Sequence, residues 1–172
     1  MNTRLQHLQQ KIVDHDTALQ RIQMWKLRAD KVVFTNGCFD LLHTGHVCYL
    51  AESSELGNRL IVALNTDSSV KRQGKGVDRP VNKEDSRATV LAALGYVDLV
   101  VFFDKDTPLE LINFLKPDII VKGADYDPNE QDESAKTYIV GSKEVRSFGG
   151  SAVAIPLVEG FSTTGIIAKL NS

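Results

Sequence analysis

The sequence predicts an α/β domain built on a parallel five-stranded sheet, with helices covering both faces. Short runs rich in Val, Ile, Leu and Phe have the length and composition of buried strands. Segments with apolar residues at helical spacing lie between these runs. Strand and helix alternate along most of the chain, which is typical of a doubly wound parallel sheet.

Residues 1–30 are expected to form a helical segment that precedes the sheet-forming domain, residues 31–172. Apolar residues recur at helical spacing over residues 4–28, and a polar patch at 14–17 suggests a break. Asp16 or Thr17 is predicted to cap the second of the two helices. We expect this segment to pack on the edge of the domain or on a partner subunit.

Five runs are predicted to be the strands of the sheet. They are residues 31–35, 59–64, 99–102, 119–122 and 152–155. In a sheet of this kind ligands bind beyond the carboxyl ends of the strands, where the strand order reverses. The loops after the first, second, fourth and fifth strands are therefore expected to carry function.

The helices between these strands have recognisable ends. The first is expected to stop near Gly57, because glycine is common directly after a helix. Asn82 is predicted to cap a helix over 83–94, with Asp85 completing an arrangement that resembles a capping box. Pro108 is placed in the first turn of the next helix, and the last helix is expected to begin at Ser162.

The composition excludes several classes of protein. The 172 residues, 42% hydrophobic and 24% charged, are those of an ordinary globular domain. A formal charge of −2 gives no electrostatic case for binding nucleic acid or an anionic membrane. Two cysteines, Cys38 and Cys48, are too few for a disulfide framework, and no signal peptide or membrane-spanning run is found. We expect a cytoplasmic protein.

A loop with two histidines follows the first predicted strand and reads TNGCFDLLHTGH over residues 35–46. Gly37 lets the backbone approach a ligand closely. His43 and His46 lie three residues apart where a helix is expected to begin, and the dipole and exposed N–H groups of a helix start attract anions. The two imidazoles can donate hydrogen bonds to phosphoryl oxygens. The helix start disfavours their protonation and a bound triphosphate favours it, but an N–H donor exists in either state.

Two other kinds of site are disfavoured for this loop. Cys38, His43, His46 and Cys48 have a spacing that can mimic zinc ligands, but residues 46 and 48 of one helix project in nearly opposite directions, which disfavours convergence on one metal ion. An ordinary dinucleotide site is disfavoured because no G-x-G-x-x-G follows the strand.

The sequences GCFD at 37–40 and HTGH at 43–46 resemble the signature of the cytidylyltransferase-like nucleotidyltransferases. The resemblance extends from about residue 31 to the end of the chain. Within that family the chain is most similar to the adenylyltransferase half of the bifunctional heptose-phosphate kinase/adenylyltransferase of lipopolysaccharide synthesis. The similar stretches are 35–40, 65–67, 79–82, 121–126, 141–145 and 162–164.

The resemblance implies a Rossmann-like fold and a defined reaction. D-glycero-β-D-manno-heptose 1-phosphate and ATP would give ADP-heptose and pyrophosphate, with Mg²⁺ as cofactor. It also implies a homodimer, and a separate sugar kinase that makes the acceptor, because the kinase half is absent. Residues 129–136 are an acidic and polar insertion after the fourth strand and depart from the family pattern.

Two alternatives stay open at this stage. A cytidylyltransferase acting on glycerol 3-phosphate or a similar small phosphate would keep every catalytic residue and differ only in its pockets. A nucleotide-binding regulatory domain without turnover is the alternative from another class. The intact histidine pair argues against the second, because a sensor needs no donors aimed at a reacting phosphorus.

Site residues are assigned partly from the chain and partly from the resemblance. The catalytic set is His43, His46, Lys75 and Arg87, and the nucleotide-binding set is Thr35, Asn36, Gly37, Cys38, Phe39, Asp67, Lys122, Gly123, Asp125, Ser162, Thr163 and Thr164. Lys75 stands between two glycines in a basic loop, with Lys71 and Arg72 either helping it or simply solvated. The resemblance implies that Arg87 binds a phosphate. The alternative is a surface ion pair between Arg87 and Glu84.

Two acidic residues have open roles. Asp67 either orients a substrate hydroxyl or base, or only caps the helix that follows it. Asp40 is unfavourable beside phosphate unless it aligns a histidine or helps to hold Mg²⁺. Mg²⁺ is otherwise expected to be bridged by the triphosphate.

Overall fold

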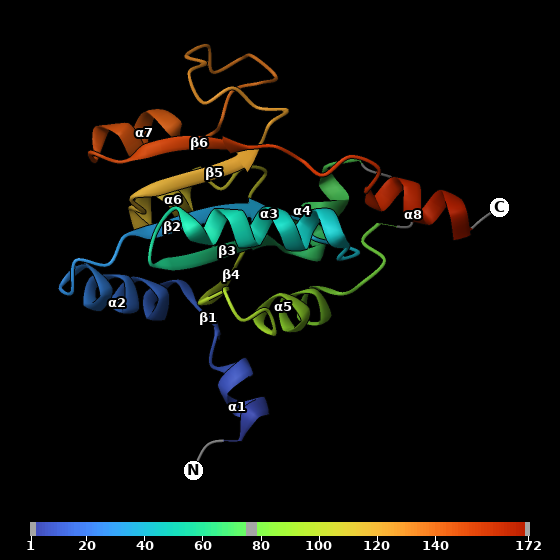
Figure 1. The fold of residues 1–172 in the computed structure, drawn as a ribbon, viewed down its shortest axis with the longest axis horizontal. Helices are drawn as coiled ribbons and strands as arrows, with labels where there is room; N and C mark the ends of the chain where they lie inside the picture. The colour runs from blue at the N-terminus through green and yellow to red at the C-terminus, as the bar shows by residue number, and fades with distance from the viewer. Residues whose placement is uncertain (1–2, 75–78, 171–172) are drawn as a thin grey trace.

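The computed structural model describes residues 3–74 and 79–170 and contains one parallel sheet flanked by helices (Figure 1). The strands lie in the order β1-β4-β3-β2-β5-β6. Their bounds are β1 Ile12–Val13, β2 Val32–Gly37, β3 Arg59–Asn65, β4 Leu99–Phe103, β5 Ile119–Gly123 and β6 Ser151–Ile155. The helices are α1 Arg4–Gln9, α2 His15–Lys26, α3 Thr44–Glu55, α4 Asp67–Arg72, α5 Glu84–Ala92, α6 Leu109–Leu115, α7 Ser142–Ser147 and α8 Thr163–Leu170.

The predicted fold class is confirmed, with one strand more than expected. All five predicted strands are present, and β1 adds a sixth at the edge of the sheet, where Ile12 pairs with Val100 and Val13 with Val101. A strand of two residues is too short to show a period of two, so the helical spacing around it hid it. The N-terminal segment therefore contributes to the sheet as well as to the helices.

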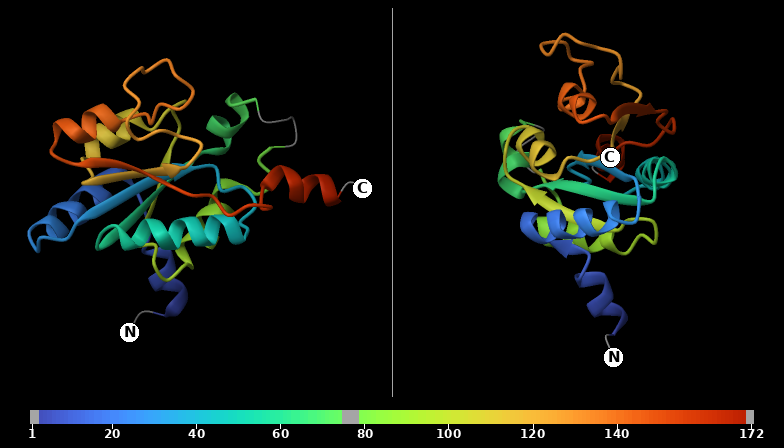
Figure 2. Two further views of the ribbon diagram at one scale, coloured as in Figure 1. Left: turned by 45° about the horizontal axis from the view of Figure 1, so that its top comes forward. Right: turned by 90° about the vertical axis from the view of Figure 1, so that its left-hand side faces the viewer.

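Helices cover both faces of the sheet because alternate strand residues point to opposite sides. One core contains Val32 and Phe34 of β2 and is closed by α2, α6 and α7. The other contains Val33 of β2 and is closed by α3 and α5. Figure 2 shows these two layers of helices and the way α1 and α8 extend from the body in different directions.

Two of the predicted helix caps are wrong. Asp14, not Asp16 or Thr17, caps α2, because its Oδ1 accepts from the N–H of Thr17 at 2.7 Å. Lys83 stands at the cap of α5 without a side-chain hydrogen bond, while Asn82 bonds elsewhere. Helix α2 therefore begins at His15, earlier than predicted, and Asn82 bonds to Asp40 instead of to the start of α5.

The other two helix ends lie close to their predicted places. Gly57 directly follows α3, as expected, but its role is packing, since a Cβ there would lie 2.8 Å from the carbonyl oxygen of Lys31. Pro108 is the cap residue of α6 and so precedes the first turn by one position.

The strand order reverses between β2 and β5. From β2 the chain proceeds outward through β3 and β4 on one side, and then returns to add β5 and β6 on the other. Parallel strands that diverge in this way leave a crevice at their carboxyl ends. The loop with the two histidines follows β2, so the fold brings it to that crevice.

Candidate active site

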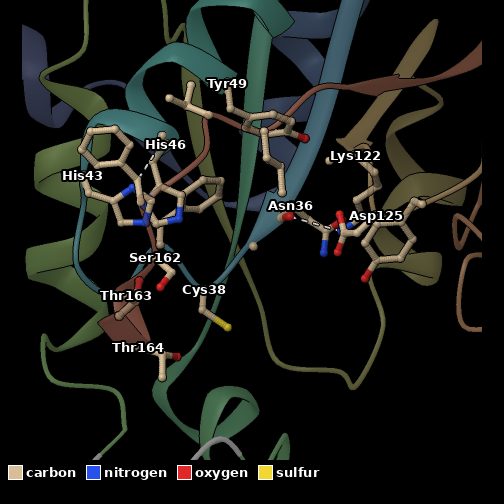
Figure 3. Close-up of a pocket in the computed structure, with 18 residues that line it drawn as sticks. Asn36, Cys38, His43, His46, Tyr49, Lys122, Asp125, Ser162, Thr163 and Thr164 are labelled. Atoms are coloured by element: carbon tan, nitrogen blue, oxygen red, sulfur yellow. Dashed lines mark hydrogen bonds between the residues drawn. The ribbon is translucent and has the colours of Figure 1, made fainter. Parts of the chain in front are cut away.

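The two histidines are held together by the start of α3. His43 is the cap residue, and its Nδ1 accepts a hydrogen bond from the backbone N–H of His46 at 3.4 Å. The two rings are stacked, with centroids 3.8 Å apart and planes 18° from parallel, as Figure 3 shows. Because Nδ1 of His43 is an acceptor here, the proton of the neutral ring is on Nε2.

The glycine between the histidines makes this stacking possible. A Cβ on Gly45 would lie 3.1 Å from both Cε1 and Nδ1 of the His43 ring and 3.3 Å from the Cβ of Phe161. Such contacts would push the ring out of its place. Thr44, the other residue between the histidines, is exposed and meets no such constraint.

The surroundings favour the neutral form of both imidazoles. Burial and, after it, the positive charge that His43 would carry together lower the pKa of His46 to about 4, while the backbone of Leu41 partly opposes the shift. Burial also lowers the pKa of His43. A neutral ring still has one N–H group, so each histidine remains a hydrogen-bond donor.

The histidines open onto a cavity of about 570 Å³. It is lined by residues of the β2–α3 loop, of α3, of the end of β5 and of the start of α8. The cavity therefore lies beyond the carboxyl ends of the strands (Figure 1). In Figure 3 the histidine pair is at one end of the cavity and Lys122 and Asp125 are at the other. A cavity of this volume fits a small ligand.

The start of α8 supplies hydroxyl and N–H groups to the same cavity. Ser162 accepts a hydrogen bond from the N–H of Gly165 at 3.0 Å and so caps the helix, as predicted. Ser162, Thr163 and Thr164 all line the cavity. The starts of α3 and α8 are therefore both directed at one place, which suits a polyanionic ligand.

Comparison with known proteins assigns the chain to a family. A family model described as cytidylyltransferase-like matches residues 34–169. The chain belongs to the cytidylyltransferase-like family. It is a nucleotidyltransferase, and its two stacked histidines lie within the matched residues.

Relatives of this nucleotidyltransferase are longer proteins. The chain is 51% identical, over 94% of its own length, to the bifunctional protein HldE of Magnetococcus marinus, and 52% identical to that of Caulobacter vibrioides. It spans about a third of the length of these relatives, 31% and 32%.

Two solved structures share the fold of the nucleotidyltransferase. The lipopolysaccharide core biosynthesis protein of Thermoplasma volcanium is 28% identical, with a TM-score of 0.57 over 75% of this chain and 97% of that one. Pantoate-beta-alanine ligase of Francisella tularensis is only 13% identical, with a TM-score of 0.58 over 93% of this chain and 76% of that one, and shows the likeness of fold alone.

Most residues assigned to the site of the nucleotidyltransferase do line the cavity. These are Asn36, Gly37, Cys38, Phe39, His43, His46, Lys122, Gly123, Asp125, Ser162, Thr163 and Thr164. Lys75 lies outside the residues that the structure describes. Thr35, Asp67, Arg87 and Asp40 are not among the lining residues, and each is bonded to other residues of the protein.

Thr35 is fully buried behind the cavity wall. Its hydroxyl bonds to the phenol oxygen of Tyr49 at 2.7 Å and to the carbonyl oxygen of Val121 at 3.1 Å. Burial raises the pKa of that Tyr49 phenol to about 12. Thr35 therefore joins β2, α3 and β5 below the site and presents no hydroxyl to a ligand.

Arg87 is likewise buried, and it neither faces the cavity nor pairs with Glu84. Its guanidinium donates to the carbonyl oxygens of Asn82, Cys38 and Asn65 at 3.0, 2.6 and 2.8 Å, and to the Asp67 carboxylate at 2.8 Å. Thr66, and not Asp67, caps α4. The arginine thus connects the histidine loop, the end of β3, the start of α4 and the loop before α5.

Asp40 has a similar structural role from the other side of the same loops. One carboxylate oxygen accepts from the N–H of Asn82 at 2.9 Å, and the other from the N–H of Val81 at 3.0 Å and lies 2.5 Å from Arg79 Nε. Asn82 returns a hydrogen bond to the Asp40 carbonyl at 2.9 Å. We refer to three of these residues as the loop anchor: Asp40, Asn82 and Arg87.

Arg72, which lies just before the undescribed loop, is also bonded within the protein. Arg72 forms ion pairs with Asp104 at 3.5 Å and Asp106 at 3.0 Å and so fastens α4 to the loop after β4.

Residues 129–136 contact α7, where Glu133 pairs with Lys143 at 2.9 Å. Within the described residues, no helix is both long and apolar enough to span a bilayer.

Some residues of the cavity were not predicted. Tyr49, Tyr126, Leu157, Val158 and Phe161 all line it. Tyr49 lies one helical turn after His46, so the sequence does indicate that both side chains are on the same face of the helix. Leu157 and Phe161 are 53% and 45% exposed, and large apolar side chains left open in a cavity suit a ring-shaped ligand.

Proposed function

We propose that this nucleotidyltransferase transfers AMP from ATP to D-glycero-β-D-manno-heptose 1-phosphate, forming ADP-heptose and releasing pyrophosphate. The stacked, neutral histidine pair at the start of α3 is the observation that carries the proposal, because it points donors into a cavity that suits a triphosphate. The choice of ATP and heptose is supported by the stretches similar to heptose-phosphate adenylyltransferases and by relatives named HldE at about half identity.

The reaction needs positioning and charge stabilisation, and no covalent nucleophile from the protein. An oxygen of the acceptor phosphate forms a bond to the α-phosphorus, and the bond from that phosphorus to the bridging oxygen breaks. Pyrophosphate leaves with the electron pair. The N–H groups of His43 and His46 donate to phosphoryl oxygens as negative charge builds on them, and the start of α8 binds further oxygens.

Mg²⁺ fits this site mainly as a partner of the triphosphate. Both Asp40 carboxylate oxygens accept backbone N–H groups, those of Val81 and Asn82, and no group of three metal-binding side chains occurs among the described residues. Asp125 lines the cavity and is the carboxylate nearest to hand for the ion or its waters. When bound, Mg²⁺ neutralises charge on the phosphates, which is its usual way of binding in such enzymes.

Further parts of the proposal come from the resemblance and from the composition. The resemblance implies a homodimer and a separate sugar kinase that supplies the sugar 1-phosphate, and the two cysteines, too few for a disulfide framework, support a cytoplasmic location.

A pyrophosphate-release assay tests the reaction. ATP, CTP, GTP and UTP are each combined with heptose 1-phosphate, with other sugar 1-phosphates and with glycerol 3-phosphate. We expect the fastest release with ATP and heptose 1-phosphate. A preference for CTP and glycerol 3-phosphate would replace this proposal by a cytidylyltransferase, and no release with any combination would favour a regulatory nucleotide-binding domain.

His46→Ala tests the role of the histidine pair. Removing a preorganised donor to a developing charge lowers turnover by roughly 10²-fold or more. His7→Ala is the matched control, because His7 is exposed on α1 and outside the site. Turnover near the wild-type value in His46→Ala, with an unchanged circular dichroism spectrum, would contradict the assignment.

A further inference from the structure

A second cavity adjoins the first along a shared wall. It has a volume of about 400 Å³ and lies between the ends of β2, β3 and β5, the end of α4 and the start of α6. The wall common to both cavities is formed by Asn36, Gly37, Cys38, Lys122 and Tyr126. A bimolecular transfer needs two binding places that meet at the reacting atoms, and this wall is where the two cavities meet.

The two cavities differ in chemistry. The first has the histidine pair, the start of α8 and apolar Leu157 and Phe161, which suit a nucleotide. Beyond the shared wall, the second has amide, carboxylate and hydroxyl groups, from Asn65, Gln73, Asp106 and Thr107, beside the apolar Pro108 and Val140. Such groups pair well with the hydroxyl groups of a sugar.

The positive charge in both cavities comes from one place on their common wall. Within the described residues, Lys122 is the one lysine or arginine that lines either cavity, and it lines both. A phosphate monoester carries up to two negative charges and needs a cation when it leaves water. Lys122 therefore places this cation at the wall, whereas Asp106, in the second cavity, is already paired with Arg72 at 3.0 Å.

The position of the Lys122 ammonium is fixed by the sheet. Lys122 is in β5 and Asn36 is in the adjacent strand β2, and the ammonium donates to the carbonyl oxygen of Asn36 at 3.3 Å. It also lies over the ring of Tyr126, 5.4 Å from the ring centre. These contacts hold the charge at the crevice where the strand order reverses, with little side-chain freedom left to lose on binding.

We propose that the second cavity binds the sugar of the acceptor, and that Lys122 binds the acceptor's phosphate at the wall shared with the nucleotide. This inference rests on the proposed function and adds to it the place of the second substrate. The phosphate oxygen that Lys122 orients forms the bond to the α-phosphorus, the bond to the pyrophosphate breaks, and no proton transfer is required. Lys122 is thus a catalytic residue on the acceptor side and not a contact to the base.

The test compares Lys122→Gln with Lys122→Arg and with the control Lys105→Gln. Lys105 is exposed at the same edge of the sheet, pairs with Glu110 and lines neither cavity. Calorimetric titration measures the binding of heptose 1-phosphate and of ATP separately. Lys122→Gln is expected to weaken sugar-phosphate binding ~10- to 100-fold, as for loss of a charge-assisted hydrogen bond, and ATP binding less than about 3-fold.

The variants separate the acceptor side from the nucleotide side. Lys122→Arg should restore most of the sugar-phosphate affinity, and Lys105→Gln should match wild type for both ligands. In steady-state kinetics the KM for the sugar phosphate should rise in Lys122→Gln while the KM for ATP stays near its wild-type value. Equal weakening of both ligands, or weakening of ATP alone, would overturn the inference.

Failure of the proposed function would be recognised separately. If heptose 1-phosphate binds wild type but is not turned over, the reaction is wrong while the binding comparison still decides the role of Lys122. Glycerol 3-phosphate and inorganic phosphate are titrated in the same way, so the comparison does not depend on heptose being the acceptor. Equal affinity of wild type and Lys122→Gln for each phosphate that binds, or no binding of any of the three phosphates to wild type, would overturn the inference.

Discussion

The histidine pair and the loop anchor share one short loop but use their polar atoms differently. Asp40 and His43 are three residues apart, yet the Asp40 carboxylate is fully buried with both oxygens bonded to backbone N–H groups, whereas the His43 ring lines a cavity. Arg87 resembles Asp40 in having its donors used by the protein. A charged residue in a signature motif can therefore hold the loop in shape through bonds within the protein.

Arg87→Met would give the largest loss of stability. It leaves buried carbonyl oxygens of Cys38, Asn65 and Asn82 without their donor and the Asp67 carboxylate without its ion pair. Breaking a buried charged pair costs about 3–5 kcal/mol. Urea denaturation should show this loss, with Arg87→Lys intermediate. A normally stable variant with weakened ATP binding would instead make Arg87 a phosphate ligand and remove it from the loop anchor.

The stability of wild type should decrease as the pH falls from about 6.5 to about 4, and His46 should contribute. In this window the unfolded chain binds a proton at His46 and the folded chain does not, since burial lowers the folded pKa to about 4. Protonation therefore favours unfolding. The contribution is on the order of 1–2 kcal/mol, less than the full shift implies because the ring is partly exposed.

His46→Gln should flatten that acid limb of the stability curve. Urea midpoints at pH 7 and pH 4.5 would be compared for wild type, His46→Gln and the exposed control His7→Gln. An equal pH dependence in all three proteins would show that the histidine pair is not desolvated in solution, and the contrast with the loop anchor would then be lost.

Arg72→Ala should have the smallest effect of the three. The Arg72 side chain is 45% exposed and those of Asp104 and Asp106 are 60% and 80% exposed, so both ion pairs are screened by water. Such pairs stabilise by about 0–1 kcal/mol. A loss of stability as large as that of Arg87→Met would mean that burial does not separate the two arginines.

The sheet and the histidine site were predictable because their signals are local. Each predicted strand is an unbroken apolar run, and His43, Gly45 and His46 stand together next to one of these strands. The order of alternating elements then brings the loop to the carboxyl edge of the sheet. The two-residue strand β1 could not be found, because its pairing with β4 depends on residues nearly ninety positions away.

The loop anchor was not predictable from the same signals. Three of the partners of Arg87 are backbone carbonyl groups, which leave no mark in the sequence, and Cys38 is 49 residues away from it along the chain. Asn82 has the residue type of a helix cap, but the buried Asp40 competes for its hydrogen bonds. Residue type predicts what a side chain can do, while burial decides which partner it has.

The hydrogen bond by which the His43 ring caps α3 also limits how this site could be altered. Its Nδ1 accepts the hydrogen bond from the N–H of His46 and so caps the helix, while the proposed phosphate contact uses Nε2 on the other side of the same ring. Lengthening the turn by one residue would separate the two imidazoles and unfasten the helix at once. Substitutions between the two histidines should be tolerated at Thr44, which is exposed, whereas at Gly45 even one added carbon would contact the His43 ring.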